Sequence, residues 1–130
     1  MGIVKYSKQR EAIKQYLAST TSHPTAEIVY KNIQKIYPNI SLGTVYRNLN
    51  FLVEHGEAQK LSCDDNKEHY DGNTTPHSHF YCRSCRQVSD LNTPTVNLPD
   101  LLKDTDFGGT VDSYMTFFMG TCSECERQAE

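Results

Sequence analysis

The sequence predicts an α+β protein in which an N-terminal winged helix-turn-helix domain precedes a small C-terminal α/β domain with a four-cysteine zinc site. Two observations support this fold class: three amphipathic helical patterns are followed by two strand-like runs, and four of the five cysteines form two C-x-x-C pairs. We place the domains at residues 1–72 and 73–130, because Gly72 and Pro76 interrupt regular structure between them. Neither half is long enough to bury much apolar surface alone, so a metal or a second chain is expected to stabilise them.

Three helices are predicted in the first half. The first spans about residues 7–19, the second follows the N-cap residue Thr25, and the third follows the N-cap residue Ser41. The second helix should stop before Pro38, and Gly56 should end the third as its left-handed C-cap residue. The apolar residues expected to face the core are Ala12, Ile13, Tyr16, Leu17, Ile28, Val29, Ile33, Ile36, Val45, Leu49 and Leu52.

Strand-like runs follow the helices. Residues 57–63 and 68–72 flank a polar turn and match the wing of a winged helix, which makes the third helix the one that reads DNA. The second half is expected to contain short strands and one helix. The strands are predicted at 77–82, 87–91 and 113–121, and the helix near 98–103.

The charge is distributed unevenly along the chain. Through Lys60, eight basic residues face four acids, and beyond it twelve acids face five bases. This asymmetry indicates a basic module for a polyanion, joined to an acidic module that could hold cations. The sequence contains no apolar run long enough to span a bilayer and no signal-peptide core, so we expect a cytoplasmic protein with no membrane partner.

Four cysteines have the spacing of a structural zinc site. Cys82 and Cys85 form one C-x-x-C turn, and Cys122 and Cys125 form a second one. Two such turns can complete a tetrahedron of thiolates around Zn²⁺ and so stabilise a small domain. A redox-active use of the pairs is less favoured, since neither pair opens the helix of a βαβ unit, and a rubredoxin-like iron site would leave the helical half unexplained.

Histidines and aspartates form a second candidate metal site. His77 and His79 alternate, so on a strand both imidazoles point to one face. Asp71 and Asp90 flank them, and His23 stands at the entrance to the second helix. This mixture of neutral nitrogens and carboxylates suits Fe²⁺, Mn²⁺ or Zn²⁺, and ligand type alone does not choose among them.

Three further residues of metal-binding type stand outside these clusters. We expect Cys63 to be a small buried apolar residue. For His55 and His69 we expect an ordinary surface or core position.

These motifs, in this order, resemble the Fur family along nearly the whole chain, and its peroxide-sensing PerR-type branch in particular. Asp90 is typical of that branch, since iron-uptake regulators tend to have glutamate there. Iron-uptake regulators also have one extra histidine just before the H-x-H and another in a late strand. This chain has Pro76 at the first position and no histidine in the segment 111–118. The motifs are His23-Pro-Thr-Ala with Ile-Val-Tyr30, Ser41-Leu-Gly-Thr44-Val-Tyr46-Arg47-Asn48-Leu, His69-Tyr-Asp71, His77-x-His79-Phe-x-Cys82-x-x-Cys85, Val88-Ser-Asp90 and Cys122-x-x-Cys125.

The resemblance implies a homodimeric repressor that binds a palindromic DNA operator through its winged helix and dimerises through its C-terminal domain. It implies structural Zn²⁺ at the four paired cysteines. It also implies that Fe²⁺ or Mn²⁺ occupies the regulatory site. The residues implied for that site are His23, Asp71, His77, His79 and Asp90.

The implied signal is hydrogen peroxide, which reacts when Fe²⁺ is bound and oxidises His23 or His77, so that metal and DNA are released. The protein would be a single-use sensor and no enzyme. For DNA, arginine pairs with guanine and asparagine with adenine, and lysines contact phosphates. The residues expected at DNA are Thr44, Tyr46, Arg47, Asn48, Lys5, Lys8 and Lys60.

Three alternatives stay open. The first is an iron- or zinc-uptake regulator that responds to metal abundance. The second is a small C-x-x-C redox enzyme. The third is a plain metal-storage or interaction module.

Overall fold

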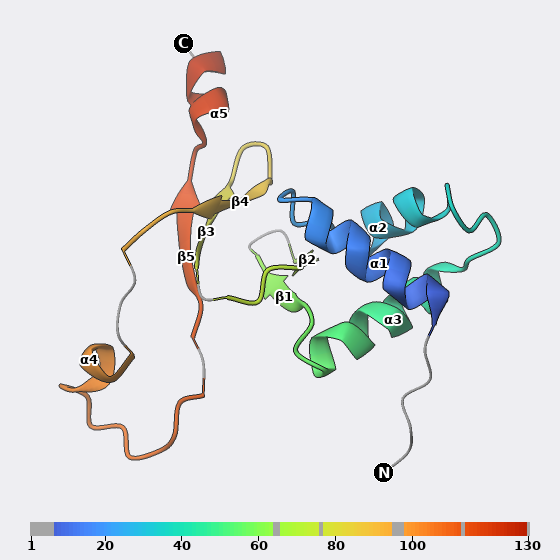
Figure 1. The fold of residues 1–130 in the computed structure, drawn as a ribbon. Helices are drawn as coiled ribbons and strands as arrows, with labels where there is room; N and C mark the ends of the chain where they lie inside the picture. The colour runs from blue at the N-terminus through green and yellow to red at the C-terminus, as the bar shows by residue number, and fades with distance from the viewer. Residues whose placement is uncertain (1–6, 64–65, 76, 95–97, 113, 130) are drawn as a thin grey trace.

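The structure is a computed structural model that describes residues 7–63, 66–75, 77–94, 98–112 and 114–129. Three helices lie together on one side of the molecule and a three-stranded sheet lies on the other, with a two-stranded hairpin between them (Figure 1). The helices are α1 (Lys8–Ser19), α2 (Ala26–Ile33) and α3 (Leu42–Glu54). The predicted α+β class is confirmed.

Capping side chains mark the starts of α1 and α3, whereas the N-cap residue of α2, Thr25, makes no side-chain cap hydrogen bond. Ser7 Oγ accepts from the Arg10 N–H at 3.2 Å, and Ser41 Oγ accepts from the Thr44 N–H at 3.1 Å. At the end of α3, Gly56 has a φ of 71°, the left-handed conformation that glycine adopts without a Cβ penalty. The core that these helices enclose consists of Ile13, Leu17, Ala26, Val29, Ile33, Ile40, Val45, Leu49, Leu52, Ala58 and Tyr70.

Helix α2 differs from its prediction. It ends at Ile33, and the residues up to Pro38 form a turn. Ile28 and Ile36 are 45% and 62% exposed, so their expected place in the core was wrong. Val29 and Ile33 are one helical turn apart and already form the buried stripe, which leaves Ile28 on another face of a helix this short.

The part of the chain predicted as a wing, called the wing below, is an antiparallel hairpin of β1 (Gln59–Ser62) and β2 (Glu68–Asp71), close to the predicted runs. Two backbone contacts join β2 to the chain ahead of α2: the Tyr70 N–H donates to the Pro24 carbonyl at 2.9 Å, and Thr25 forms a bridge with His69. After β2, a Cβ at Gly72 would lie 2.7 Å from the Leu17 carbonyl carbon. Only glycine therefore lets the chain pass this close to the end of α1.

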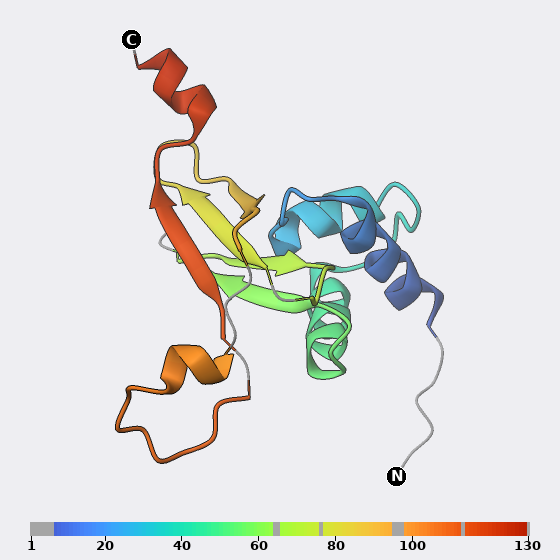
Figure 2. The same ribbon diagram turned by 60° about the vertical axis from the view of Figure 1, so that its left-hand side comes forward.

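The sheet combines β3 (Ser78–Cys82), β4 (Val88–Leu91) and β5 (Thr116–Gly120) in the order β4-β3-β5. β3 is antiparallel to β4 and parallel to β5, and β5 forms one edge (Figure 2). The predicted helix near residue 98 is α4 (Leu98–Leu102). One helix was missed: α5 (Ser123–Gln128), which begins directly after its N-cap residue Cys122.

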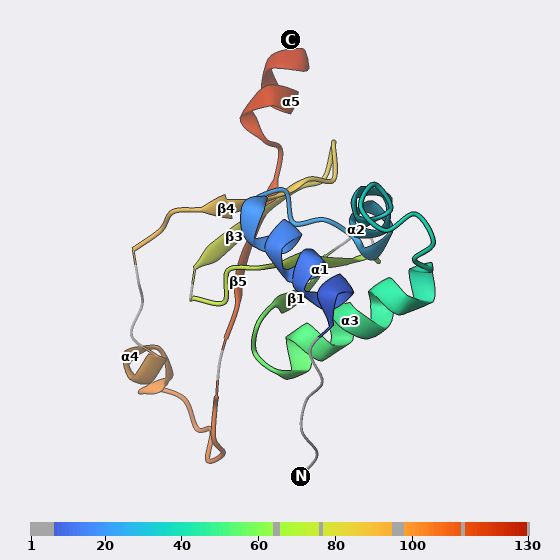
Figure 3. The ribbon, with the colours of Figure 1, turned by 45° about the vertical axis from the view of Figure 1, so that its right-hand side comes forward.

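A second, smaller core joins the wing to the sheet. Leu61 of β1 packs with Tyr81 of β3 and Val88 of β4, and all three are buried. Cys63 and Phe117 pack against this cluster and are half-buried. Cys63 therefore packs among apolar residues, as predicted, but it is less buried than expected. Figure 3 shows how the wing lies between the helices and the sheet. Among the described residues, no helix is both long and apolar enough to cross a bilayer.

Candidate metal centres

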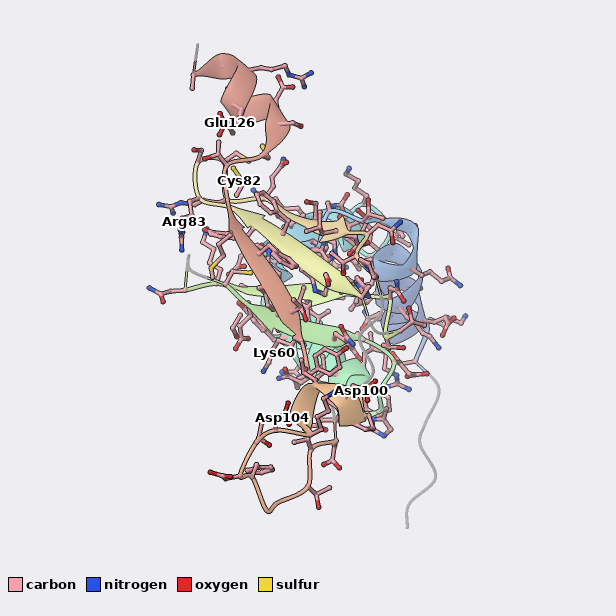
Figure 4. All side chains as sticks on the ribbon, turned by 90° about the vertical axis from the view of Figure 1, so that its left-hand side faces the viewer. Lys60, Cys82, Arg83, Asp100, Asp104 and Glu126 are labelled. Carbon is pink, nitrogen blue, oxygen red and sulfur yellow. The ribbon has the colours of Figure 1, made fainter. Side chains whose placement is uncertain are left out.

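The four paired cysteines meet at one end of the sheet. Cys82 lies at the end of β3 close to α5 (Figure 4), and Cys122 and Cys125 come from the start of α5. Cys82 Sγ lies 3.8 Å from Cys125 Sγ, and Cys85 Sγ lies 3.9 Å from Cys122 Sγ. A tetrahedral Zn²⁺ with bonds of about 2.3 Å requires sulfur–sulfur distances of about 3.8 Å, so the cluster fits Zn²⁺.

The acidity of these thiols also indicates a site that favours a bound cation. Backbone N–H groups of Cys85 and Cys122 both donate to Cys82 Sγ at 3.4 Å, and these bonds lower the pKa of the Cys82 thiol to about 6. Neighbouring Cys122 and burial raise the pKa of the Cys125 thiol to about 12. Several thiolates this close together repel one another unless a cation lies between them, which is the role that Zn²⁺ would fill.

All five residues predicted for the regulatory site also converge. His23 comes from the chain between α1 and α2, Asp71 ends β2, His77 precedes β3, His79 lies in β3 and Asp90 in β4. One ligand atom from each lies within 4.8 Å of the others. His79 and Asp90 are register partners in the antiparallel β3–β4 pair, which places their side chains on one face. Segments from both halves of the chain therefore build one site.

The two carboxylates occupy the centre of this cluster. Asp71 Oδ2 lies 3.2, 2.9 and 3.1 Å from the Nε2 atoms of His23, His77 and His79. Asp90 Oδ1 lies 2.9 Å from His23 Nε2 and 3.0 Å from His77 Nε2. Ligands on opposite sides of an ion with bonds of about 2.1 Å are roughly 4.2 Å apart, so five atoms this close need only small shifts to surround a divalent ion.

Backbone carbonyls select the tautomers of two histidines. His23 Nδ1 lies 3.0 Å from the Val88 carbonyl oxygen, and His77 Nδ1 lies 2.6 Å from that of Thr75. A carbonyl only accepts, so both Nδ1 atoms carry the proton. In the neutral ring the Nε2 lone pair then faces a carboxylate oxygen, which is repulsive unless the ring is protonated or a cation lies between. This geometry is typical of metal-binding histidines.

The titration of these groups agrees with this interpretation. Burial lowers the pKa of His23, but the hydrogen bond to Asp71 and the charges of Asp71 and Asp90 outweigh it and raise that pKa above its usual value. Burial lowers the pKa of His77. The hydrogen bond to the Thr75 carbonyl and the charges of the two aspartates outweigh burial and raise that pKa above its usual value. Burial raises the pKa of Asp71, yet the hydrogen bonds from His23 and His79 hold it well below its usual range. Without metal, the two carboxylates thus favour the protonated form of the His23 and His77 imidazoles.

Access to the site is one-sided. The His23 and His79 side chains are each 1% exposed, whereas Asp90 is 38% exposed. The His79 ring stacks on Phe117 of β5 with centroids 5.3 Å apart, and its buried Nδ1 has no hydrogen-bond partner among the described residues. His79 is therefore held by stacking and by the Asp71 contact of its Nε2, while His23 and His77 also contact backbone carbonyls through Nδ1. The solvent-exposed part of the cluster is therefore on the side of Asp90 and His77.

Four of the seven residues predicted at DNA lie near the start of α3: Thr44, Tyr46, Arg47 and Asn48. Arg47 is exposed and donates to Thr44 Oγ1 at 2.9 Å, and Asn48 donates to the Thr44 carbonyl at 3.0 Å. Tyr46 instead donates its hydroxyl to Glu27 Oε1 of α2 at 3.1 Å. The lysines lie elsewhere: Lys8 is exposed at the start of α1, Lys60 is exposed on β1 (Figure 4) and 3.6 Å from Glu68, and Lys5 lies outside the described residues.

Two positions near the regulatory site were missed by the sequence reasoning. His69 is 7% exposed, and its Nδ1 lies 2.8 Å from the His23 carbonyl oxygen. Its place two residues before Asp71 on a strand puts both on one face, which is the only sequence signal that points to it. No sequence pattern places Phe117 near this site, because its contact with His79 depends on the pairing of β3 with β5.

The sequence matches proteins of one family. The family model of the ferric uptake regulator family matches residues 2–107, a range that ends before Cys122 and Cys125. The peroxide-responsive repressor PerR of Staphylococcus epidermidis is 34% identical over 127 residues, which cover 96% of this chain and 83% of the relative. PerR of Staphylococcus aureus is 34% identical over 125 residues, which cover 95% and 83%.

Solved structures share the fold. The peroxide stress regulator of Campylobacter jejuni aligns with a TM-score of 0.76 at 30% identity, covering 90% of this chain and 88% of its own. The ferric uptake regulator of Helicobacter pylori aligns with a TM-score of 0.79 at 24% identity, covering 95% and 83%, which supports the fold. The extent of the family match and the identity to the curated relatives show that this chain belongs to the ferric uptake regulator family.

Proposed function

We propose that this protein is a metal-dependent repressor that releases operator DNA when hydrogen peroxide oxidises a ligand histidine. The observation that supports this most is the convergence of His23, from between two helices of the DNA-reading half, with His77, His79 and Asp90 of the other half. Relatives named peroxide-responsive repressors share 34% of its residues across most of the chain. The aspartate at position 90 agrees with that branch.

The two clusters suit different ions. The closed cysteine tetrahedron would hold Zn²⁺ for structure, and the nitrogen and carboxylate site would hold Fe²⁺ or Mn²⁺. When bound, Fe²⁺ supplies the redox chemistry toward hydrogen peroxide, and Mn²⁺ permits repression without that sensitivity. The chain itself supplies three Nε2 lone pairs and two carboxylates in a nearly buried cluster.

The oxidation changes a ligand of the protein. One oxygen atom of hydrogen peroxide is added to the imidazole of His23 or His77, and the other leaves as water. The modified ring no longer presents the same lone pair, so the site loses a ligand. Because His23 belongs to the helical half, this loss releases the link between the two halves.

This link is what couples metal to DNA. Binding that needs ligands from both halves stabilises only the conformer that brings them together. In a dimer, that conformer would place two α3 helices about one DNA turn apart for a palindromic operator. A coupling of 1–3 kcal/mol changes DNA affinity by roughly 5- to 150-fold.

The dimer would form through the sheet. β5 is an edge strand, and an exposed edge of this kind pairs readily with a second copy. Met115, Phe118 and Met119 on or beside β5 are 43–47% exposed although they are apolar. A second copy would cover this surface and bury them.

The test uses the full chain with zinc in the cysteine site. A palindromic duplex is first selected from a random DNA pool with the Mn²⁺-loaded protein, and its affinity is then measured by fluorescence anisotropy for the Fe²⁺ and Mn²⁺ forms. Peroxide should release DNA from the Fe²⁺ form only, and mass spectrometry should find one added oxygen on a peptide with His23 or His77. A His55→Ala variant, changed at an exposed histidine on the α3 end, should respond like the unaltered protein.

Other results would support the alternatives. Oxidation confined to cysteines would refute the histidine mechanism. DNA release by an iron chelator, without any release by peroxide, would support a regulator of metal uptake that senses abundance. Thiol-dependent catalytic turnover would support a C-x-x-C redox enzyme.

A further inference from the structure

A buried histidine of the wing contacts the backbone of a regulatory ligand. His69 lies in β2 and is 7% exposed. Its Nδ1 lies 2.8 Å from the His23 carbonyl oxygen, and because that oxygen only accepts, the Nδ1–H of His69 donates. His69 itself is outside the group of five converging ligand atoms.

The backbone that His69 contacts has an unfavourable conformation. His23 has a φ of 53°, in the left-handed region where a side chain with a Cβ is strained. Neighbours must hold such a residue in place. β2 provides three contacts to this short segment: the His69 bond to His23, the Tyr70 N–H bond to the Pro24 carbonyl at 2.9 Å, and the bridge between His69 and Thr25.

This conformation decides where the His23 ring points. The ring must reach Val88 O with Nδ1 at 3.0 Å and the carboxylates of Asp71 and Asp90 with Nε2 at 3.2 and 2.9 Å. A rotation of the backbone at residue 23 would swing the imidazole away from all three. The same strand that supplies Asp71 therefore also fixes the one ligand that comes from the helices.

We propose that His69 is a positioning residue that holds His23 in its strained conformation and thereby prepares the regulatory site for its ion. The inference rests on the proposed function, because it concerns the same site. Interactions that orient metal ligands typically contribute roughly 10- to 100-fold to metal affinity. His69 acts through the backbone of the ligand, whereas Val88 acts through its ring.

Three variants separate positioning from packing. His69→Asn keeps an N–H donor on Cγ, where the Nδ1 of histidine is attached. His69→Gln keeps the polarity but moves the donor one carbon farther. His69→Leu fills the space without any donor. The Asn and Gln variants form the matched pair, and they keep the test decisive even where the Leu variant fails to fold.

The experiment measures Mn²⁺ affinity of the zinc-loaded full chain by competition with a fluorescent chelator. The Gln and Leu variants should bind Mn²⁺ roughly 10- to 100-fold more weakly, and the Asn variant should recover most of that loss. The visible absorption of Co²⁺ in the same site should be altered in the Gln variant and near the unaltered spectrum in the Asn variant. Zinc content and the far-ultraviolet melting curve serve as measures of fold and should be alike for Asn and Gln.

Two results would overturn the inference. One is Mn²⁺ affinity in the Gln variant equal to that of the unaltered protein, and the other is an equal loss in the Asn and Gln variants, which would indicate packing alone. Failure of the proposed function looks different. In that case the unaltered protein itself would not bind Mn²⁺, or its affinity for DNA would be the same with and without the metal.

Discussion

At the scale of single residues, Asp71 is the most constrained ligand of the regulatory cluster. Its Oδ2 is within 3.2 Å of three imidazole nitrogens, and it is 5% exposed. Asp90 contacts two of these nitrogens at up to 3.0 Å and is far more exposed. The two carboxylates are therefore unequal, and we expect the buried one to contribute more to holding an ion.

We predict that Asp71→Asn lowers Mn²⁺ affinity by more than about 100-fold, and more than Asp90→Asn does, because the amide removes the charge that faces all three rings. Isothermal titration of the zinc-loaded protein measures this. Glu68→Gln, an exposed change in the same strand, is the control and should leave affinity unchanged. Equal losses for the two aspartates would contradict the asymmetry of the site.

Arg47 is the most exposed of the predicted base-reading residues on α3, and its guanidinium lies beside Thr44. We predict that Arg47→Ala weakens binding to the selected duplex by about 1–3 kcal/mol, roughly 5- to 150-fold, and relaxes base preference at one position. Arg127→Ala, a loss of the same charge on α5, should have little effect. If Arg47→Ala weakened binding equally for all DNA sequences, this result would indicate that Arg47 contacts phosphates and not bases.

At the scale of elements, the cysteine cluster fastens β5 to β3. Cys82 ends β3 and Cys85 follows it, while Cys122 follows β5, so one ion would join the ends of two parallel neighbours. The Arg83 N–H also donates to the Gly120 carbonyl at 2.8 Å next to this junction. A parallel pair has no tight turn of its own, because its strands need a long crossover, and an ion at the cysteines would take the role of that turn.

We predict that Cys125→Ser abolishes zinc binding and detaches β5, since a structural zinc site contributes directly to folding. Metal analysis and hydrogen exchange at residues 116–120 measure the two effects. Cys63→Ser is the matched control, because Cys63 lies outside the cluster, and it should retain zinc. An unchanged melting curve for Cys125→Ser would show that the strand pairing is sufficient.

At the scale of the whole molecule, the regulatory site lies where the helices, the wing and the sheet meet. Leu61 of β1 packs on Tyr81 and Val88, so the wing is joined to the sheet by apolar contact as well as through the metal ligands. Phe117 links the site onward to β5 by stacking on His79. Metal binding, sheet packing and the exposed edge of β5 are therefore parts of one connected structure.

We predict that Phe118→Lys shifts the protein from dimer to monomer, because it places a charge on the apolar edge surface. Analytical ultracentrifugation measures the shift, and Mn²⁺ binding should persist while DNA binding is lost. Ile36→Lys is the control for oligomeric state, since Ile36 is also apolar and exposed but belongs to the helical half. A dimer that survives Phe118→Lys would place the interface elsewhere.

Much of this protein could be predicted from local sequence. Ser7, Ser41 and Gly56 act on their nearest neighbours, so helix ends could be predicted from them. The five residues predicted for the regulatory site and the four paired cysteines were chosen from residue type and motif resemblance, and the structure brings each group together. The extent of α2 and the presence of α5 were missed: α2 ends after its last buried residue, Ile33, and α5 buries no residue, so it has no apolar stripe that a sequence pattern could show.

The sequence by itself determined which residues offer ligand atoms and where helices begin, since both depend on residue chemistry and short-range hydrogen bonds. Only the tertiary structure decided that His23 meets the sheet, that His69 supports it, and that β5 runs parallel beside β3. These contacts join residues from 38 positions apart, as in Ser78 and Thr116, to 67 positions apart, as in His23 and Asp90. Long-range contacts of this kind depend on the packing of all elements together, which no local pattern encodes.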